Sequence, residues 1–512
     1  MGRNSEPHDQ ESDRRVSRRR FARAVGVSSI GAGIAGCLGG DGGNGNGNGN
    51  GNGNGNGNGN DSGNGNGNGN GNGNGNESGN GNGNATEDGE WADLSGTEIH
   101  VLTEEASTQW QEFWNELNTA FEQETGASVN MEYVGIGTGY RERLTQLLQA
   151  GDPPEVTHIG VQDIVTFATN GQAGDVTPAV EYFENEYDTE ITTERGAVEL
   201  DGTHHMVPLF INADMYHYRD DVATDVGDDY PQTWDDVLGM MEEYDEGQGG
   251  MRAGYLPLGQ NDCAKYYIIS AAYMAGGTVC GRDDNGDVQI TMHEGENRES
   301  WVQALEFWKE RSQYQSLDTQ GDCSSYSSAI PSETTFAGHY FGNRPKIQSV
   351  EQELPFADSV RERQCARPEG QEDNPVLGLL QGVSTFEGAN VEGANEWIKF
   401  MVQPDFMFDF LMLSPVHNAP VVPEVVEHEQ YQEGLSELPD AWTEADIQAH
   451  LTEENRRAFP HETDPPNPYT GQLFADDALW QLVWDVIQED MDAGEALDSA
   501  ASTLQDTLDG AR

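Results

Sequence analysis

The fold is decided by residues 98–160, which read EIHVLTEEASTQWQEFWNELNTAFEQETGASVNMEYVGIGTGYRERLTQLLQAGDPPEVTHIG. Residues 98–103, 129–133 and 156–160 have the short apolar patterns of strands. Between these strands, apolar side chains recur at helical spacing, and a glycine ends each helix, at Gly126 and at Gly151. The helical positions are Trp110, Phe113, Trp114, Leu117 and Phe121, then Leu144, Leu147 and Leu148. This alternation predicts an α/β fold in which a parallel sheet has helices on both faces.

The order of the strands also predicts where a ligand would bind. Right-handed crossovers place the C-terminal ends of the three strands, and the loops that follow, at one edge of the sheet. Open α/β sheets bind their ligands at that edge. Residues 91–512 are too many for one simple core, so we expect two lobes.

The charge of the chain excludes several classes of partner. The 512 residues include 90 acidic and 26 basic side chains, for a net charge of −64. Such a surface repels nucleic acid and anionic lipid, whose phosphates need a basic face. Because molar salt screens this repulsion, the composition favours a halophilic protein of haloarchaeal type.

The first 36 residues form a basic segment, in contrast to the acidic remainder of the chain. Residues 17–21, Ser-Arg-Arg-Arg-Phe, resemble a twin-arginine export signal, and residues 22–36 are a short apolar run. The run ends in Ile34-Ala35-Gly36-Cys37, which resembles a lipobox. We therefore expect residues 1–36 to be a twin-arginine signal peptide and Cys37 to carry a lipid anchor outside the cytoplasmic membrane.

Residues 37–90 continue from the lipidated cysteine as a flexible tether of alternating asparagine and glycine. With no apolar period, the tether forms no helix or strand, and a coil of this length spans roughly 40 Å. It contains three N-x-S/T sequons, which are candidate glycosylation sites. Their asparagines are Asn60, Asn76 and Asn84.

Several motifs in residues 97–512 resemble the family 1 extracellular solute-binding proteins of ABC transporters, the maltose-binding-protein-like family. Residues 150–156, Ala-Gly-Asp-Pro-Pro-Glu-Val, resemble a conserved segment of that family, and residues 171–178, Gly-Gln-Ala-Gly-Asp-Val-Thr-Pro, resemble its next turn. Residues 231–237, Pro-Gln-Thr-Trp-Asp-Asp-Val, match a helix start of the family. Gly276-Gly277 followed by residues 284–287 match its helix-hairpin unit, and residues 396–401 a helix near the lobe crossover.

The resemblance implies a two-lobed, periplasmic-binding-protein-like fold of type II, with a ligand cleft between lobes joined by hinge strands. It implies an N-terminal lobe of residues 97–211 with 379–418 and a C-terminal lobe of residues 213–377 with 419–512. It also implies a monomer that captures a small solute, most simply a sugar or oligosaccharide, and passes it to an ABC permease in the membrane.

The resemblance further assigns ligand-binding positions, whose mixture of aromatic rings, carboxylates and amides suits the apolar faces and hydroxyl rim of a sugar. These positions are Glu104, Glu105, Asp163, Asn212, Tyr266, Tyr340 or Phe341, and Trp480. From the residues themselves we add Tyr140, which follows a glycine-rich loop, and Arg344, which could serve a phosphate. Of Trp480 and Trp484, four residues apart on one helix, at least one belongs to the core.

Signals for chemistry are weak throughout the chain, so we expect no catalytic residue, no cofactor and no metal. Residues 135–140 lack the last glycine of a dinucleotide-binding motif, because Tyr140 stands there. Residues 283–294 lack the glycine that a calcium loop needs. Two alternatives to a transport receptor remain, an anchored extracellular polysaccharide hydrolase and a surface adhesion protein.

Four cysteines lie in the expected C-terminal lobe, and an extracellular location favours two disulfides among them. They are Cys263, Cys280, Cys323 and Cys365. Pairing Cys263 with Cys280 is disfavoured because a helix of about 18 Å separates them and few residues remain for the return. The other two pairings both stay open.

Overall fold

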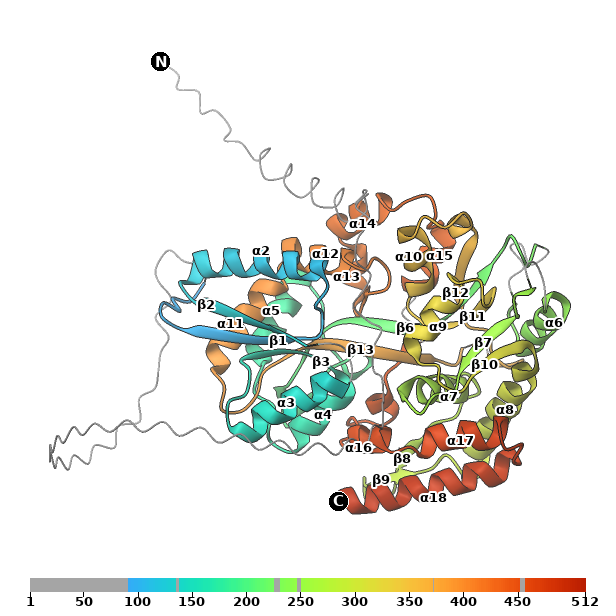
Figure 1. Cartoon of the computed structure of the whole chain (residues 1–512). Helices are drawn as coiled ribbons and strands as arrows, with labels where there is room; N and C mark the ends of the chain where they lie inside the picture. Colours follow the sequence, from blue (N-terminus) through green and yellow to red (C-terminus); the bar gives the residue numbers. More distant parts are fainter. Residues whose placement is uncertain (1–90, 135–137, 225–230, 246–249, 372, 452–455) are drawn as a thin grey trace, which may run out of the picture.

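The computed structural model describes residues 91–512 apart from 135–137, 225–230, 246–249, 372 and 452–455. These residues form two α/β lobes side by side, joined by two long strands, β6 (Val207–Arg219) and β13 (Val376–Ser384) (Figure 1). Within the described ranges, no helix combines the length and the apolar character needed to cross a membrane. The predictions for residues 1–90, which include Cys37, the tether and the three sequons, lie outside the described residues.

The first lobe is built on the predicted strand–helix repeat. Its elements are β1 (Glu98–Thr103), α2 (Thr108–Thr125), β2 (Ser128–Tyr133), α3 (Thr138–Ala150) and β3 (Val156–Gly160). β1 pairs in parallel with both β2 and β3, which confirms the parallel sheet. α2 buries the predicted apolar stripe and ends at Gly126, whose φ of 74° is left-handed. α2 covers one face of the sheet, while α3 and α4 (Val161–Thr169) cover the other (Figure 1).

The remaining elements of the first lobe pack around this sheet. They are α5 (Thr177–Tyr187), β4 (Glu199–Leu200), β5 (Thr203–His204), α11 (Val391–Met401) and α12 (Pro404–Met412). Trp110, Trp114 and Trp397 are buried in the core of this lobe, and for Trp110 and Trp114 the helical spacing predicted this.

β6 and β13 carry the sheet from one lobe into the other. They pair antiparallel, and the sheet order is β11-β6-β13-β3-β1-β2. Along β6, Phe210 and Ile211 belong to the core of the first lobe, whereas Ala213 and Met215 belong to the core of the second. β6 therefore changes lobe at Asn212. The short strand β14 (Ala419–Pro420) pairs with β6 beside this point.

The second lobe has its own core around α7 and α8. Its elements are α6 (Trp234–Tyr244), β7 (Gly254–Pro257), α7 (Asp262–Met274), β8 (Cys280–Arg282), β9 (Val288–Ile290), α8 (Gly295–Arg311), β10 (Gln315–Asp318), α9 (Cys323–Ala329), β11 (Ala337–Phe341), α10 (Arg344–Glu351), β12 (Val360–Gln364), α16 (Thr470–Ala475), α17 (Ala478–Ile487) and α18 (Ala493–Ala511). The predicted helix start is confirmed, because Thr233 and Asp236 form a capping box at α6. The hairpin between β8 and β9 is confirmed too, and Asp283 accepts the backbone N–H groups of Asn285 and Asp287 in its turn. Trp234, Trp301 and Trp308 are buried in this core.

Residues 421–451 differ from the expectation that residues 419–512 all join the second lobe. The elements after β14 are α13 (Pro423–Glu427), α14 (Glu429–Ser436), α15 (Glu444–Leu451) and β15 (Arg456–Arg457). Val422, Tyr431 and Trp442 belong to the core of the first lobe, whereas α15 packs against β12 of the second. Sequence periodicity shows that a helix has an apolar face but not which core that face meets.

The cysteines form one disulfide rather than the two expected. Cys263 and Cys323 are bonded, with Cα atoms 5.3 Å apart, and this is one of the pairs left open by the sequence. Cys280 and Cys365 are free and buried. The second disulfide was a wrong prediction because these two thiols have different surroundings. The charge of Glu462 helps to raise the pKa of Cys280, whereas Cys365 contacts the backbone carbonyl of Asp214 and the ring of His339.

Candidate functional site

The expected ligand positions come from elements of both lobes that meet at the interlobe boundary. From the first lobe, Glu104 and Glu105 follow β1, and Asp163 lies in the first turn of α4. The second lobe contributes side chains from four elements. They are Tyr266 on α7, Tyr340 and Phe341 on β11, Arg344 at the start of α10 and Trp480 on α17.

Arg141 of α3 connects the two lobes directly. Its Nε lies 3.2 Å from Asp163 Oδ2 in the first lobe, and its Nη1 lies 3.3 Å from Asp262 Oδ2 at the start of α7 in the second. Burial raises the pKa of Asp163, and the positive charge of Arg141 opposes that rise. Sequence reasoning missed Arg141 and Asp262. The only signal was that Arg141 is one of few cations in an acidic chain and adjoins Tyr140.

The charge of Arg344 in the second lobe also acts on Glu105 in the first lobe. Burial raises the pKa of the Glu105 carboxyl, and Arg344 acts in the opposite direction. Burial also raises the pKa of Tyr340, and Arg344 again lowers it. One guanidinium of the second lobe thus acts on a carboxyl of the first lobe and on an expected ligand-binding tyrosine.

Tyr266 lies beside the Arg141 contact. Its ring stacks on Phe474, with centroids 4.6 Å apart, and meets the edge of Phe341 at 5.7 Å. Burial raises the pKa of Tyr266, as does Asp262, whereas Arg141 lowers it. Phe341 itself is a core residue, 5% exposed. Of the two alternatives on β11, Tyr340 is the half-buried one.

Trp480 and Trp484 are both half-buried and pack against each other on α17, with ring centroids 5.4 Å apart. The indole Nε1 of Trp480 donates to the carbonyl oxygen of Leu258 at 3.0 Å. That hydrogen bond holds the N–H edge of the Trp480 ring in place. A half-buried ring fixed in this way can offer a face to an apolar surface.

Tyr140 and Asn212 use their polar groups within the protein. Tyr140 is 5% exposed, and its hydroxyl contacts Thr157 and the carbonyl oxygen of His158. Asn212 is 8% exposed, and its amide nitrogen donates to the carbonyl oxygen of His417. Tyr140 therefore braces the strands of the first lobe, and Asn212 ties β6 to the segment before β14. Direct contact of either residue with a solute remains a prediction that this geometry does not favour.

One group of side chains in the described residues is suited to hold a metal ion. It consists of Asp214, His339 and Cys365. This group does not form a nucleophile–base–acid relay, because both Asp214 and Cys365 contact the same nitrogen of His339, Nδ1.

Comparisons with known proteins agree with this arrangement. Residues 116–436 match the family model described as bacterial extracellular solute-binding protein. No curated protein sequence matches the chain. Among solved structures, the GacH receptor of Streptomyces glaucescens has a TM-score of 0.63 at 15% identity, covering 81% of this chain and 99% of its own. Maltose-bound MalE3 of T. maritima has a TM-score of 0.62 at 17% identity, covering 80% and 99%.

A third solved structure, the cyclic α-maltosyl-1,6-maltose binding protein of Arthrobacter globiformis, has a TM-score of 0.61 at 14% identity, covering 81% and 99%. At these identities the structures establish the two-lobed fold, and the family model, which matches more than half of the chain, establishes the family. The chain belongs to the bacterial extracellular solute-binding proteins.

Proposed function

We propose that this protein captures a sugar or oligosaccharide between its lobes and delivers it to the membrane permease of an ABC importer. The observation that carries the proposal is the meeting of polar groups from both lobes beside an aromatic ring. Arg141 lies between Asp163 of one lobe and Asp262 of the other, next to Tyr266. A solute held there would touch both lobes at once.

The residues at the boundary suit a carbohydrate. A pyranose has apolar C–H faces that stack on aromatic rings and hydroxyl groups that bind carboxylates and guanidinium groups. Tyr266, Tyr340 and Trp480 supply the rings, and Glu105 and Asp163 supply the carboxylates. Among the similar structures, the receptor of S. glaucescens forms a complex with acarbose, and MalE3 of T. maritima is bound to maltose.

The mechanism requires binding energy but no bond chemistry. A solute that contacts both lobes binds the closed form more tightly than the open form, so it shifts the population toward closure. The permease would recognise the closed pair of lobes and release the solute by separating them. Nothing in this cycle calls for a nucleophile or a cofactor.

We further propose that the chain is exported by the twin-arginine route, is lipidated at Cys37 and acts as a monomer on the outer face of the membrane. The signal of residues 1–36, the lipobox-like sequence and the tether of residues 37–90 support this location. The acidic composition supports a halophilic setting, where molar salt screens the charge. The lobe boundaries near residues 212 and 378 are part of the same proposal.

A thermal-shift screen in molar salt tests the proposal. The protein is melted with neutral oligosaccharides, polyols, phosphate esters and polyamines, because a solute at 100 Kd adds about 2.7 kcal/mol of stability. We expect a shift with a neutral sugar that is lost in Trp480→Ala. The matched control is Trp484→Ala, a substitution one turn away on the same helix.

The screen also separates the alternatives. Chromatography should recover the bound sugar intact, whereas a hydrolase would shorten it. A surface adhesion protein would give no shift with any small solute. If both Trp480→Ala and Trp484→Ala lose the thermal shift equally, the α17 face affects binding only by stabilising the fold. If both variants keep the thermal shift, Trp480 is not part of the solute site.

A further inference from the structure

Three neighbouring strands of the second lobe place three different metal-binding side chains on one face. β6 pairs antiparallel with β11 on one side and with β12 on the other. The register sets Phe341 opposite Asp214 and Gln364 opposite Met215. His339 pairs with Tyr216, two residues beyond Asp214, and Cys365 directly follows β12, so Asp214, His339 and Cys365 share a face of the sheet.

The side chains of these three residues converge. His339 Nδ1 lies 3.2 Å from Asp214 Oδ2 and 3.3 Å from Cys365 Sγ. One ligand atom from each residue lies within 4.8 Å of the others. In a tetrahedral zinc site, nitrogen, oxygen and sulfur ligands are about 3.4–3.6 Å apart, so the two separations from His339 need to change by only a few tenths of an ångström.

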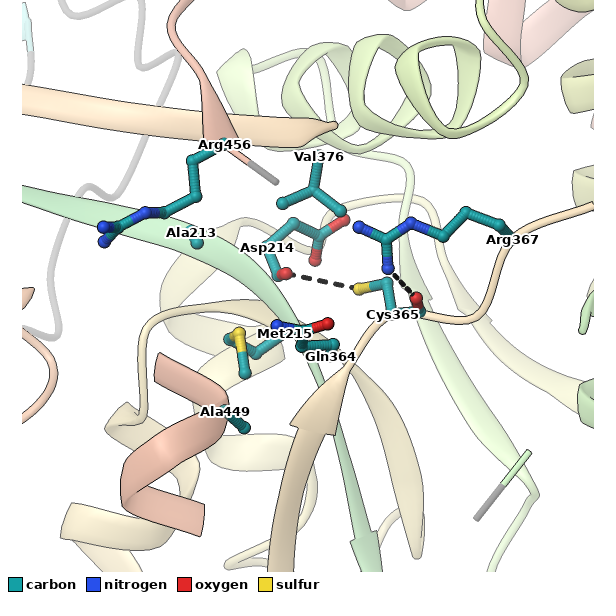
Figure 2. A pocket seen from close by; sticks show the side chains of 9 residues that line it. All are labelled: Ala213, Asp214, Met215, Gln364, Cys365, Arg367, Val376, Ala449 and Arg456. Atoms are coloured by element: carbon teal, nitrogen blue, oxygen red, sulfur yellow. Dashed lines mark hydrogen bonds between the residues drawn. The ribbon is translucent and has the colours of Figure 1, made fainter. Parts of the chain in front are cut away.

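The cluster is buried and adjoins one small cavity. Asp214, His339 and Cys365 are 0%, 3% and 2% exposed. Figure 2 shows the cavity beside Asp214 and Cys365, with Gln364, Arg367 and Val376 also in its wall. Its volume of about 10 Å³ is at the lower limit for holding one water. A water there could act as the fourth ligand that a three-residue zinc site requires.

The charges around the cluster set its preference among cations. Asp214 and a Cys365 thiolate together balance a divalent ion. Arg367 also lies beside the cluster, where it donates to the carbonyl oxygens of Cys365 and Asn374, and its charge acts on both His339 and Cys365. Arg311 lies over the ring of Trp308 at 4.7 Å, and its charge acts on both His339 and Cys365. That charge favours the thiolate and opposes weakly bound cations, so only a thiophilic ion gains enough from coordination.

We propose that Asp214, His339 and Cys365 form a buried site for a divalent cation of the zinc class. On binding, the Cys365 thiol gives its proton to solvent and a metal–sulfur bond forms, while no group is oxidised or reduced. Magnesium and calcium, which prefer oxygen ligands, do not compete for a nitrogen–sulfur site. The site uses none of the proposed solute-binding residues, and it joins β12 and its following residue to the two strands that carry Asn212 and Tyr340.

The test uses the full chain in molar KCl with excess magnesium, which saturates surface carboxylates. A Cys37→Ser background leaves Cys280 and Cys365 as the free thiols of the five cysteines. After treatment with EDTA, the protein is titrated with Co²⁺ and Zn²⁺. We expect about one ion per chain, and a sulfur-to-cobalt charge-transfer absorption that Zn²⁺ displaces.

Variants identify the ligands. Cys365→Ser and His339→Gln should weaken Co²⁺ binding more than tenfold, and Cys365→Ser should abolish the charge-transfer band. Cys280→Ser, which removes the other buried thiol, is the matched control and should change neither. Circular dichroism confirms that each variant is folded.

X-ray absorption of the zinc-loaded parent protein, which carries only Cys37→Ser, keeps the proposal testable if the buried variants do not fold. A sulfur neighbour at about 2.3 Å is expected. A zinc shell of oxygen and nitrogen alone, a titration with no ion retained, or a band lost in Cys280→Ser and kept in Cys365→Ser would overturn the proposal.

Discussion

Lys346→Met should destabilise the protein because it removes one half of a buried ion pair. Lys346 of α10 and Asp446 of α15 are both fully buried, with Nζ 2.7 Å from Oδ2. Loss of one partner of such a pair costs about 3–5 kcal/mol, since the other charge stays buried. Arg363 still contacts Asp446 at 2.7 Å, so we expect the lower end, about 3 kcal/mol.

The matched control is Lys309→Met. Lys309 pairs with Asp490 at 2.5 Å, but the Asp490 side chain is 86% exposed, and such pairs contribute little to stability. Urea unfolding in molar KCl gives the two losses of stability. Hydrogen exchange over residues 444–451 shows whether α15 detaches first. A Lys346→Met variant as stable as Lys309→Met would refute the reasoning that the pair anchors α15.

The same pair predicts a pH dependence. Burial alone would raise the pKa of Asp446, but Lys346 and the backbone N–H of Glu362 lower it to about 2. Because the folded pKa lies below the unfolded value of 3.8, the stabilisation is present above about pH 4 and is lost as the pH falls toward 2. The shift corresponds to about 2 kcal/mol. Lys346→Met should reduce this acid dependence.

Three further changes have distinct expected outcomes. Replacing Cys263 and Cys323 by serine should cost about 4 kcal/mol in urea unfolding, given their separation of 60 residues, and an unchanged midpoint would contradict a bond in solution. Burial raises the pKa of Glu462 to about 7, so the stability it contributes is full below pH 4.5 and lost as the pH rises through 7. Glu462→Gln should flatten this decline of about 3 kcal/mol, and a slope equal to wild type would argue against a buried carboxyl. Arg141→Met should weaken solute binding severalfold with less than about 1 kcal/mol of stability lost, because its side chain is 41% exposed. Arg143→Met, whose partner Glu132 is in the same lobe, should leave binding unchanged, and an equal effect of both would remove the interlobe role.

The elements of residues 98–160 could be predicted because each is specified locally. The apolar stripe of α2 lies at helical spacing, and Gly126 adopts the left-handed conformation that ends the helix. The capping box of Thr233 and Asp236 is equally local, since both residues lie within one helical turn. Such features depend on neighbours in sequence, so the pattern alone is enough.

The contacts of the candidate site depend instead on how distant segments meet. The bond between Arg141 and Asp262 joins residues 121 positions apart in different lobes, and no local pattern marks either one. Tyr140 is a different case. Its glycine-rich loop suggested a ligand contact, which stays a prediction, while its hydroxyl contacts β1 and β3, two strands that only the folded sheet brings together.

The few cations of this acidic chain form specific ion pairs, which the composition alone does not reveal. All four lysines of the chain form ion pairs in the structure, and two of them are almost fully buried. The pairs are Lys265 with Asp262, Lys309 with Asp490, Lys346 with Asp446 and Lys399 with Glu396. In a chain of net charge −64, a lysine on the open surface could be replaced by an acid, whereas one buried against a carboxylate, as Lys346 is, could not. The position of each rare cation is therefore a better guide to structural and interlobe contacts than the position of any single acid, and Arg141, paired with Asp163 and Asp262, follows the same rule.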